Sequence, residues 1–207
     1  MVTDERFPER VIFLDVDGVP SSASQVAQVL HAADATMDSG EDLFLRPCLE
    51  RLALVASRGA AGIVLSSSWR LEPASVEEVR RQLATVKLSL WGATASDATL
   101  GPSTRAQEIV DWLQKAQEVT QRCVVLDDLD LGLGSCFVQV NGKEGLSDAD
   151  VEAAVVTLNS RRGDVSAVLK SFSDAVCGAP WRERWEKLER KSAKKKKQKK
   201  EKKEDIW

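Results

Sequence analysis

The feature that most constrains the fold of this chain is a series of short apolar runs, several of which end in carboxylates or hydroxyls. Four of these runs are VIFLDV (11–16), AGIVLSSS (61–68), RCVVLDDLD (122–130) and CFVQVN (136–141). A shorter run, VKLSLWG (86–92), is a candidate for a fifth. Continuous runs of Val, Ile and Leu are typical of parallel strands that are buried on both faces. The runs therefore predict a buried parallel sheet.

Helical patterns lie between the apolar runs. The spacing of apolar residues predicts helices over 47–59, 73–86, 103–117 and 146–163. The residues expected at the ends of these helices are Gly59, Ser103 or Thr104, Ser147 and Gly163. Because strands alternate with helices, we expect an α/β fold, a three-layer Rossmann-like parallel sheet with helices on both faces.

Charge divides the chain into an acidic globule and a basic tail. Residues 191–207 hold nine lysines and three acidic residues, so the net charge of −3 for the whole chain leaves −9 on residues 1–190. We expect the α/β domain over 1–178, an amphipathic helix over 179–192 and a disordered lysine-rich tail over 193–207. The tail is interpreted as a solvated tail, a nuclear localisation signal or an arm that binds nucleic-acid phosphates.

The N-terminus and the cysteines indicate the compartment. The charged start, MVTDERFPER, lacks the apolar segment of a signal peptide, and no run approaches the roughly 20 apolar residues that span a bilayer. The four cysteines, which form no CxxC pair and are interpreted as reduced thiols, are Cys48, Cys123, Cys136 and Cys177. We expect an intracellular protein, cytoplasmic or nuclear, without a membrane partner. Its oligomeric state stays open.

The first apolar run ends in an acidic turn that contains Asp15, Asp17 and Gly18. Ligands of open α/β sheets bind beyond the carboxyl ends of the strands. Two carboxylates at the end of a buried strand are costly unless a cation or a substrate requires them. One of them can attack phosphorus while the other moves a proton, and Gly18 lets the chain turn away sharply. The alternative is a solvated acidic turn without a ligand.

Three further polar features follow in order along the chain. Ser66 and Ser67 end the second run, where hydroxyls and backbone N–H groups can hold phosphate oxygens. Arg105, at the start of a predicted helix, can offset negative charge or can simply be exposed. Asp127 and Asp128 end the third run, and carboxylate oxygens are suitable ligands for Mg²⁺. The alternative for the two aspartates is an acidic loop.

The order DVDGV, SSSWR, a basic residue and VVLDDLD resembles the four motifs of the haloacid dehalogenase (HAD) superfamily. With GATASDATLGPSTRAQEIVDWL, it resembles more narrowly the HAD domains of multi-enzyme RNA-repair proteins, over roughly residues 10–147. This resemblance implies a Mg²⁺-dependent phosphomonoesterase that forms an aspartyl-phosphate intermediate on a nucleic-acid end or another large phosphorylated substrate. Two alternatives stay open, a phosphotransferase and a non-catalytic HAD-like module that binds nucleic acid or protein.

The resemblance also assigns catalytic and metal-binding roles. Asp15 is expected to be the nucleophile and a Mg²⁺ ligand. Asp17 is expected to be the general acid/base, and its backbone carbonyl also binds the metal. Asp127 and Asp128 complete the metal site, and which of them binds the metal directly stays open.

The phosphate-binding assignments are Ser66 for the transferred phosphoryl group, with Ser67 as the neighbouring candidate. The basic residue is expected to be Arg105, with Lys115 as the second candidate, where the superfamily usually has lysine. A second departure from the family pattern is Pro20, where an apolar residue, often leucine, is usual. Proline fixes φ and removes a donor, so we expect a reshaped loop after the nucleophile.

Four other residues and two segments are also considered as parts of the site or the core. Trp69 and Trp112 are expected in the core, whereas Arg70 is either a substrate-phosphate contact or a structural ion-pair partner. Nothing links His31 to catalysis. Only residues 19–46 and 71–104 leave room for a cap domain, so we expect a small lid or none and a site open to a large substrate.

Overall fold

The computed structural model describes residues 7–20, 44–94 and 102–177, except the side chains of 102, 103 and 174–177. The chain divides into two compact units, Met1–Leu169 and Lys170–Trp207. The expected amphipathic helix (179–192), the lysine-rich tail (193–207) and residues 21–43 lie outside the described residues, as does His31. Within the described ranges, no helix is both long and apolar enough to cross a membrane.

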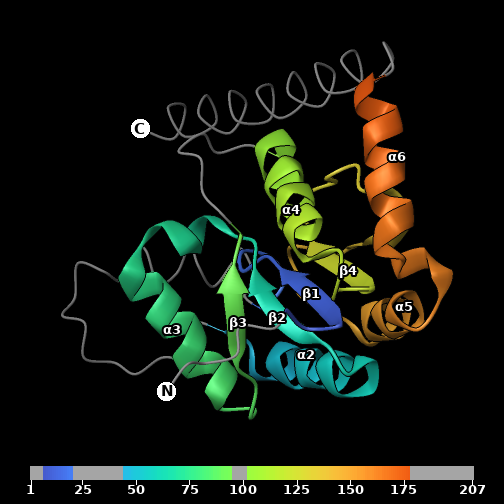
Figure 1. The fold of residues 1–207 in the computed structure, drawn as a ribbon. Helices are drawn as coiled ribbons and strands as arrows, with labels where there is room; N and C mark the ends of the chain where they lie inside the picture. Colours follow the sequence, from blue (N-terminus) through green and yellow to red (C-terminus); the bar gives the residue numbers. More distant parts are fainter. Residues whose placement is uncertain (1–6, 21–43, 95–101, 178–207) are drawn as a thin grey trace, which may run out of the picture. The chain divides into compact units, whose positions relative to one another are not determined.

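The first unit is built on a parallel sheet in the strand order β3-β2-β1-β4-β5 (Figure 1). Its strands are β1 (Arg10–Leu14), β2 (Gly62–Leu65), β3 (Leu90–Ala93), β4 (Arg122–Asp127) and β5 (Phe137–Gln139). Its helices are α2 (Arg46–Gly59), α3 (Pro73–Ala84), α4 (Pro102–Ala116) and α5 (Asp148–Leu158), and α6 (Val165–Cys177) begins in the first unit and continues into the second. Short 3₁₀ helices are η1 (Ser68–Leu71), η2 (Gly134–Cys136) and η3 (Arg161–Gly163).

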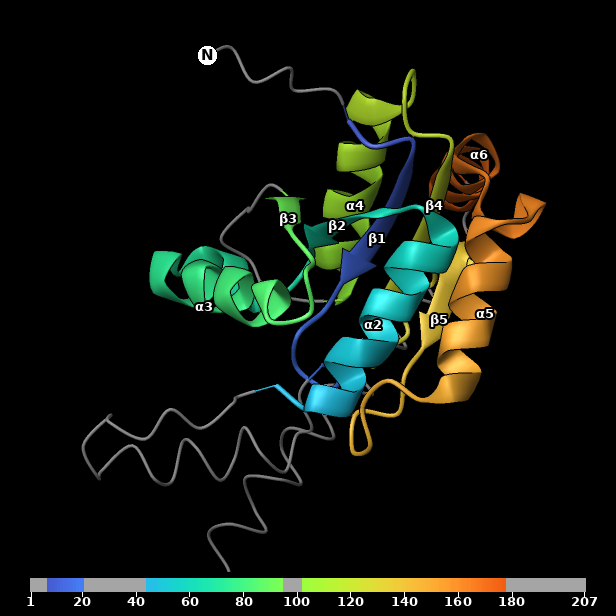
Figure 2. The ribbon, with the colours of Figure 1, turned by 90° about the horizontal axis from the view of Figure 1, so that it is seen from below.

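Alternate residues of the strands face two different helical layers. Ile12 and Leu14 of β1 belong to a core cluster with residues of α2, α3 and α5. Phe13 lies between them in sequence and packs edge-on against Trp112 of α4, with ring centroids 5.2 Å apart. Figure 2 shows α2 and α5 side by side, across the strands from α4. The predicted three-layer α/β sheet is therefore confirmed.

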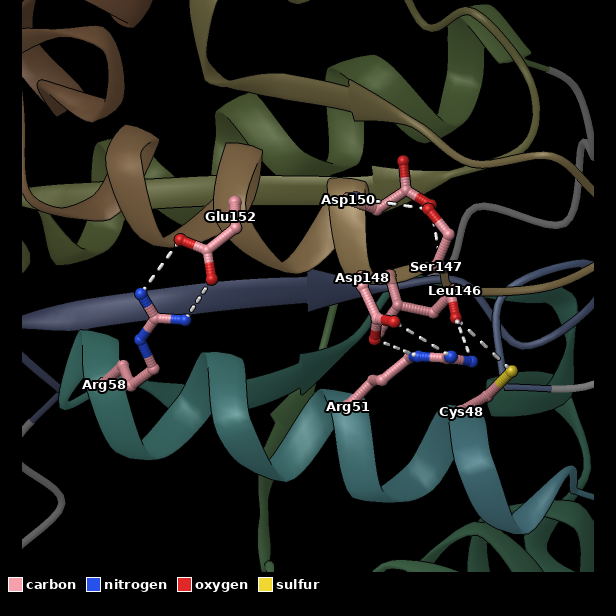
Figure 3. Close-up of polar contacts among 8 residues, drawn as sticks. All are labelled: Cys48, Arg51, Arg58, Leu146, Ser147, Asp148, Asp150 and Glu152. Atoms are coloured by element: carbon pink, nitrogen blue, oxygen red, sulfur yellow. Dashed lines mark hydrogen bonds and ion pairs between the residues drawn. The ribbon is translucent and has the colours of Figure 1, made fainter.

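Polar contacts join α2 to α5 and to the loop before α5 (Figure 3). Arg51 donates to Asp148 at 2.6 Å and to the Leu146 carbonyl at 3.2 Å. Further along both helices, Arg58 of α2 donates two hydrogen bonds to Glu152 of α5. These bonds hold α5 and the loop that leads into it against α2. The loop also borders the carboxyl end of the sheet, where the Leu146 N–H donates to the Val19 carbonyl.

Several strands are shorter than their apolar runs. β4 ends within the run 122–130 because the Asp127 carboxylate accepts the Leu129 N–H at 2.8 Å and turns the chain. β3 begins late in the run 86–92 because Lys87 has a φ of 60°, a left-handed conformation that no strand residue adopts. The apolar pattern located each strand but not its ends.

The expected C-cap of α2 at Gly59 was wrong. Gly59 is the last helical residue, and the left-handed cap is Ala60, with a φ of 49°. A Cβ at position 59 would come within 2.5 Å of Leu158 Cδ1 on α5. Glycine at position 59 therefore leaves room for the Leu158 side chain where the two helices approach, and it does not provide the cap conformation.

Ser147 caps α5 as predicted, in a capping box. α5 ends at Leu158 and not at Gly163, because η3 begins after Ser160, whose hydroxyl accepts the Arg162 N–H at 3.2 Å. The sequence pattern predicted one helix where the structure has two, α5 and η3, because Ser160 caps the start of η3.

Two further helices differ from expectation. α4 begins at Pro102, so neither Ser103 nor Thr104 stands at the N-cap. Proline suits the first turn of a helix, because its missing N–H has no intrahelical partner there. α6 (Val165–Cys177) was not predicted. The region 71–104 holds α3 and β3, which belong to the main fold, so its described residues contain no separate cap domain.

Candidate active site

The carboxyl ends of β1 and β2 are held in register beyond the last strand residue. The Asp15 N–H donates to the Leu126 carbonyl at 3.0 Å, and the Ser66 N–H donates to the Leu14 carbonyl at 2.8 Å. The polar residues after each strand therefore start from fixed backbone positions at one edge of the sheet. The side chains that follow converge because the strands are parallel.

Asp15, Asp127 and Asp128 form one carboxylate cluster. Each offers an oxygen, and these oxygens lie within 4.8 Å of one another. Asp15 and Asp127 are buried, with 3% and 1% of their surface exposed, and Asp128 is half-buried. Burial, followed by the charge of Asp127, raises the pKa of Asp15 from 3.8 to about 8, although Arg105 opposes this shift. Burial also raises the pKa of Asp127 and of Asp128.

Arg105 is the basic residue that lies at this cluster. Its Nη1 atom lies 3.4 Å from Asp15 Oδ1 and also donates to Asp127 Oδ2. Lys115 lies in the last turn of α4 and is exposed. A helix rises about 1.5 Å per residue, so ten residues separate the two cations by roughly 15 Å along the axis. The geometry therefore brings Arg105 to the carboxylates and leaves Lys115 away from them.

Buried oxygens without hydrogen-bond partners lie beside the cluster. Among the described residues these include Asp15 Oδ1 and the hydroxyls of Ser66 and Ser67. The Ser67 hydroxyl also lowers the pKa of Asp15, although burial outweighs it. Unpartnered polar atoms are rare inside proteins because each costs about 1–3 kcal/mol. The Ser66 hydroxyl thus lies unpartnered at the end of β2, and the Ser67 hydroxyl lies close enough to Asp15 to lower its pKa, so an anionic ligand beside the carboxylates can use both.

The 3₁₀ helix η1 follows directly and carries Trp69 and Arg70. Arg70 pairs with Glu108 of α4 and donates to the Ser67 carbonyl. The Arg70 side chain is 4% exposed, so the structure favours a structural ion pair over a substrate-phosphate contact. Trp69 packs on the core as expected, but its Nε1–H also donates to Asp17 Oδ1 at 3.1 Å.

Other residues named from the sequence lie outside this group. Trp112 packs between Phe7 and Phe13 on the α4 side of the sheet, as expected for the core. Asp130 is exposed, and its carboxylate accepts the Gly132 N–H at 2.9 Å in a local turn. The buried cysteines whose side chains are described, Cys48, Cys123 and Cys136, are free.

Two glycines enclose Asp128, and sequence reasoning identified only one of them as part of the site. A Cβ on Gly18 would lie 3.0 Å from the Asp128 carboxylate, and one on Gly142 would lie 2.5 Å from Asp128 Oδ2. Gly18 has a φ of 92°, so it also meets the predicted need for a sharp turn. The dipeptide NG at Asn141 is typical of a turn, but no local signal shows that this turn faces a carboxylate.

Pro20, the other departure from the family pattern, is buried at the end of the same turn. Its carbonyl accepts the Leu45 N–H at 2.7 Å, which ties the turn to the start of α2. The Val19 carbonyl accepts the Leu146 N–H at 3.0 Å. The loop after Asp17 is therefore anchored on two sides in its described part.

The site combines the buried carboxylate of Asp15, the carboxylate of Asp17 with the Trp69 N–H bonded to it, and the guanidinium of Arg105. Oxygen donors in this number and spacing suit Mg²⁺, which prefers carboxylate ligands. A divalent cation would also reverse the effect of burial on Asp15, because its charge favours the ionised form. The donor set therefore fits a magnesium site next to a position for a phosphoryl group.

Comparison with known proteins agrees with this geometry. The family of HAD domains in Swiss Army Knife RNA repair proteins matches residues 11–151, a span that contains every residue of the candidate site. No curated protein and no solved structure matched the chain.

Proposed function

We propose that this chain, which belongs to the family of HAD domains in Swiss Army Knife RNA repair proteins, is a Mg²⁺-dependent phosphomonoesterase with Asp15 as its nucleophile. Family membership supports a phosphoesterase-like activity. The observation that carries the specific proposal is the buried Asp15 carboxylate, with an oxygen free of hydrogen bonds, beside Asp127, Asp128 and Arg105.

Asp15 would hold the Mg²⁺ ion with its carboxylate, together with Asp127 and Asp128, one of them directly and the other directly or through water. As the resemblance to the superfamily implies, Asp17 would add its backbone carbonyl. The ion would neutralise the charge of the cluster and orient the phosphoryl group. Arg105, which contacts two of the carboxylates, offsets further negative charge when a phosphate enters.

The reaction would proceed in two steps. Asp15 attacks phosphorus, the bond from phosphorus to the leaving oxygen breaks, and Asp17 gives that oxygen a proton. Asp17 then takes a proton from water, which attacks the aspartyl-phosphate and releases inorganic phosphate and the Asp15 carboxylate. Ser66 and Ser67 bind phosphoryl oxygens through their hydroxyls.

For the substrate, we propose a phosphorylated nucleic-acid end as the first class to test. Two observations support it: the family is named for RNA repair, and the described part of 71–104 contains no cap domain. The lysine-rich tail as a contact for nucleic-acid phosphates stays a prediction.

The test is a Mg²⁺-dependent screen of terminally phosphorylated RNA and DNA, nucleotides, phosphopeptides and p-nitrophenyl phosphate. Asp15→Asn is expected to lower kcat by about a thousandfold or more, because an amide cannot attack phosphorus, while the thermal midpoint stays at or above that of the wild type. Acid-quenched reactions of Asp17→Asn should retain phosphate on Asp15.

Each alternative function gives a different result in this screen. A phosphotransferase would pass phosphate to an added alcohol faster than to water. A non-catalytic module would show no turnover of any ester. Activity of Asp15→Asn within about tenfold of the wild type, a barrier change of only ~1.4 kcal/mol, would reject Asp15 as the nucleophile.

A further inference from the structure

A role for Trp69 in the core alone does not explain its contact with Asp17. The indole Nε1 atom lies 3.1 Å from Asp17 Oδ1, the distance of an ordinary hydrogen bond. The two residues are 52 positions apart in sequence and reach each other from two strand ends, β1 and β2. The bond therefore links the acid/base residue to the loop that carries the serine hydroxyls.

Trp69 is itself held firmly. Its ring packs against Phe44, with centroids 5.8 Å apart, and against the core formed by α2 and α3. Its carbonyl accepts the Glu72 N–H at 3.4 Å. The neighbouring Arg70 is anchored by its buried pair with Glu108. A donor fixed in this way restricts the rotamer of the carboxylate that it contacts.

An indole N–H can only donate a hydrogen bond, and it carries no charge. The Asp17 oxygen that faces it, Oδ1, therefore acts as the acceptor, and an oxygen without a proton accepts better than one that carries a proton. The other oxygen, Oδ2, remains to carry the proton that moves in the reaction.

We propose that Trp69 is a positioning residue for proton transfer: its indole N–H fixes Oδ1 of Asp17, so that Oδ2 faces the leaving oxygen and then the attacking water. This inference rests on the proposed function. In the first step Asp17 Oδ2 loses its proton to the leaving oxygen as the phosphorus–oxygen bond breaks. In the second step Oδ2 receives a proton from the water that attacks the aspartyl-phosphate. Trp69 exchanges no proton in either step.

The test compares two substrates that differ in their need for an acid. An alkyl phosphate has a poor leaving group and depends on protonation, whereas p-nitrophenyl phosphate has a good leaving group and does not. The value of kcat/KM reports the steps up to release of the alcohol, so it isolates the first proton transfer. Trp69→Phe keeps an aromatic ring on Phe44 and removes the donor.

We expect Trp69→Phe to lower kcat/KM for the alkyl phosphate by roughly 10- to 100-fold, part of the gain that general acid catalysis provides. The loss for p-nitrophenyl phosphate should be no more than about threefold, because only the assisted leaving group uses the acid. In the Asp17→Asn background, Trp69→Phe should not change the ratio between the two substrates further. Trp112→Phe is the matched control, because this half-buried indole packs on Phe13 away from the site.

A second replacement guards against a folding defect in Trp69→Phe. Placing 3-benzothienylalanine at position 69 alone keeps the size of the ring and substitutes sulfur for the N–H. It should reproduce the selective loss on the alkyl phosphate with an unchanged thermal midpoint.

The outcomes separate the inference from the proposed function. Equal losses on both substrates, or no loss with the sulfur analogue, would overturn the role of Trp69 while Asp17→Asn remained selective. If Asp17→Asn itself showed no selectivity between the two substrates, or if wild-type protein hydrolysed neither ester, the assignment on which the inference rests would fall and the inference with it.

Discussion

At the amino end of the sheet the arginines that begin β1 and β4 are paired with side chains of other elements, whereas at the carboxyl end several described polar atoms are buried without a hydrogen bond. Arg10, at the start of β1, donates to Asn159 at 2.6 Å, and Arg122, at the start of β4, pairs with Asp164 at 3.2 Å. At the other end of β1, Asp15 is 3% exposed and one of its oxygens has no hydrogen bond.

The two ends of the same strands therefore differ in what their polar groups contribute. The Arg10–Asn159 and Arg122–Asp164 pairs at the amino end satisfy the polar groups that they join and cost little free energy. The carboxyl end gathers like charges and free hydroxyls in a buried place, which lowers stability unless a cation and an anionic ligand occupy it. This contrast marks the site independently of any motif, and the four predictions that follow test it.

Removal of divalent metal should have the largest effect on activity. This treatment acts only at the carboxyl end of the sheet, where the aspartate cluster lies. In EDTA we expect kcat/KM to fall by about 100-fold or more, since loss of metal charge stabilisation costs several kcal/mol. Mg²⁺ should restore activity and raise the thermal midpoint, because it binds the folded protein. Calcium should restore little, because its coordination is larger and looser. Full activity in EDTA would show that the aspartate cluster has another role.

Gly142→Ala should have the next largest effect. A Cβ there would lie 2.5 Å from Asp128 Oδ2, so the carboxylate must move. We expect a roughly 10- to 100-fold loss of kcat/KM, partly recovered at high Mg²⁺ concentration, because small displacements at a site have large kinetic effects. Gly92→Ala is the matched control, since a Cβ at position 92 meets nothing within 4 Å. Equal behaviour of the two variants would separate Gly142 from the site.

The stability of the metal-free protein should depend on pH through Asp15. Its pKa is raised from 3.8 to about 8 by burial first and by Asp127 second, so the folded state binds an extra proton between these values. The contribution of Asp15 to the free energy of unfolding should therefore be highest below pH 3.8 and should fall as the pH rises through about 8. Urea titrations in EDTA should show a decline on the order of a kcal/mol or more. Asp15→Asn should flatten it, and an unchanged slope in that variant would assign the effect to another group.

Arg122→Ala, at the amino end, should have the smallest effect. The pair with Asp164 is about one-third exposed on both sides, so its removal should lower the free energy of unfolding by no more than about 1 kcal/mol. Turnover of p-nitrophenyl phosphate should stay at the wild-type value, because no residue of the carboxylate cluster contacts Arg122. A clear loss of activity would show that the two ends of the sheet are coupled.

The candidate site was located largely from the sequence. Apolar runs that end in polar residues predicted which side chains meet, because carboxyl ends of parallel strands share one edge. Asp15, Asp127 and Asp128 do lie together, with Ser66 and Arg105 close by. The catalytic roles of these residues stay predictions until the variants are measured.

Several features of the site were not visible in the sequence. Trp69 has the pattern of a core residue, and nothing local shows that its N–H points to Asp17. Gly142 has the pattern of an ordinary turn, although it leaves space for Asp128. Arg70 had two possible partners until the structure placed Glu108 beside it.

By itself, the sequence determined the α/β class, the order along the chain of the five strands and of helices α2 to α5, and the edge of the sheet where the polar residues gather. Periodicity can do this because it records which face of an element is buried. Tertiary structure alone decided that Arg105 and not Lys115 reaches the carboxylates, that Gly59 lies against Leu158 of α5, and that the Trp69 N–H donates to Asp17. These are contacts between distant segments, and they depend on distances and side-chain directions of a few ångströms that no local pattern records.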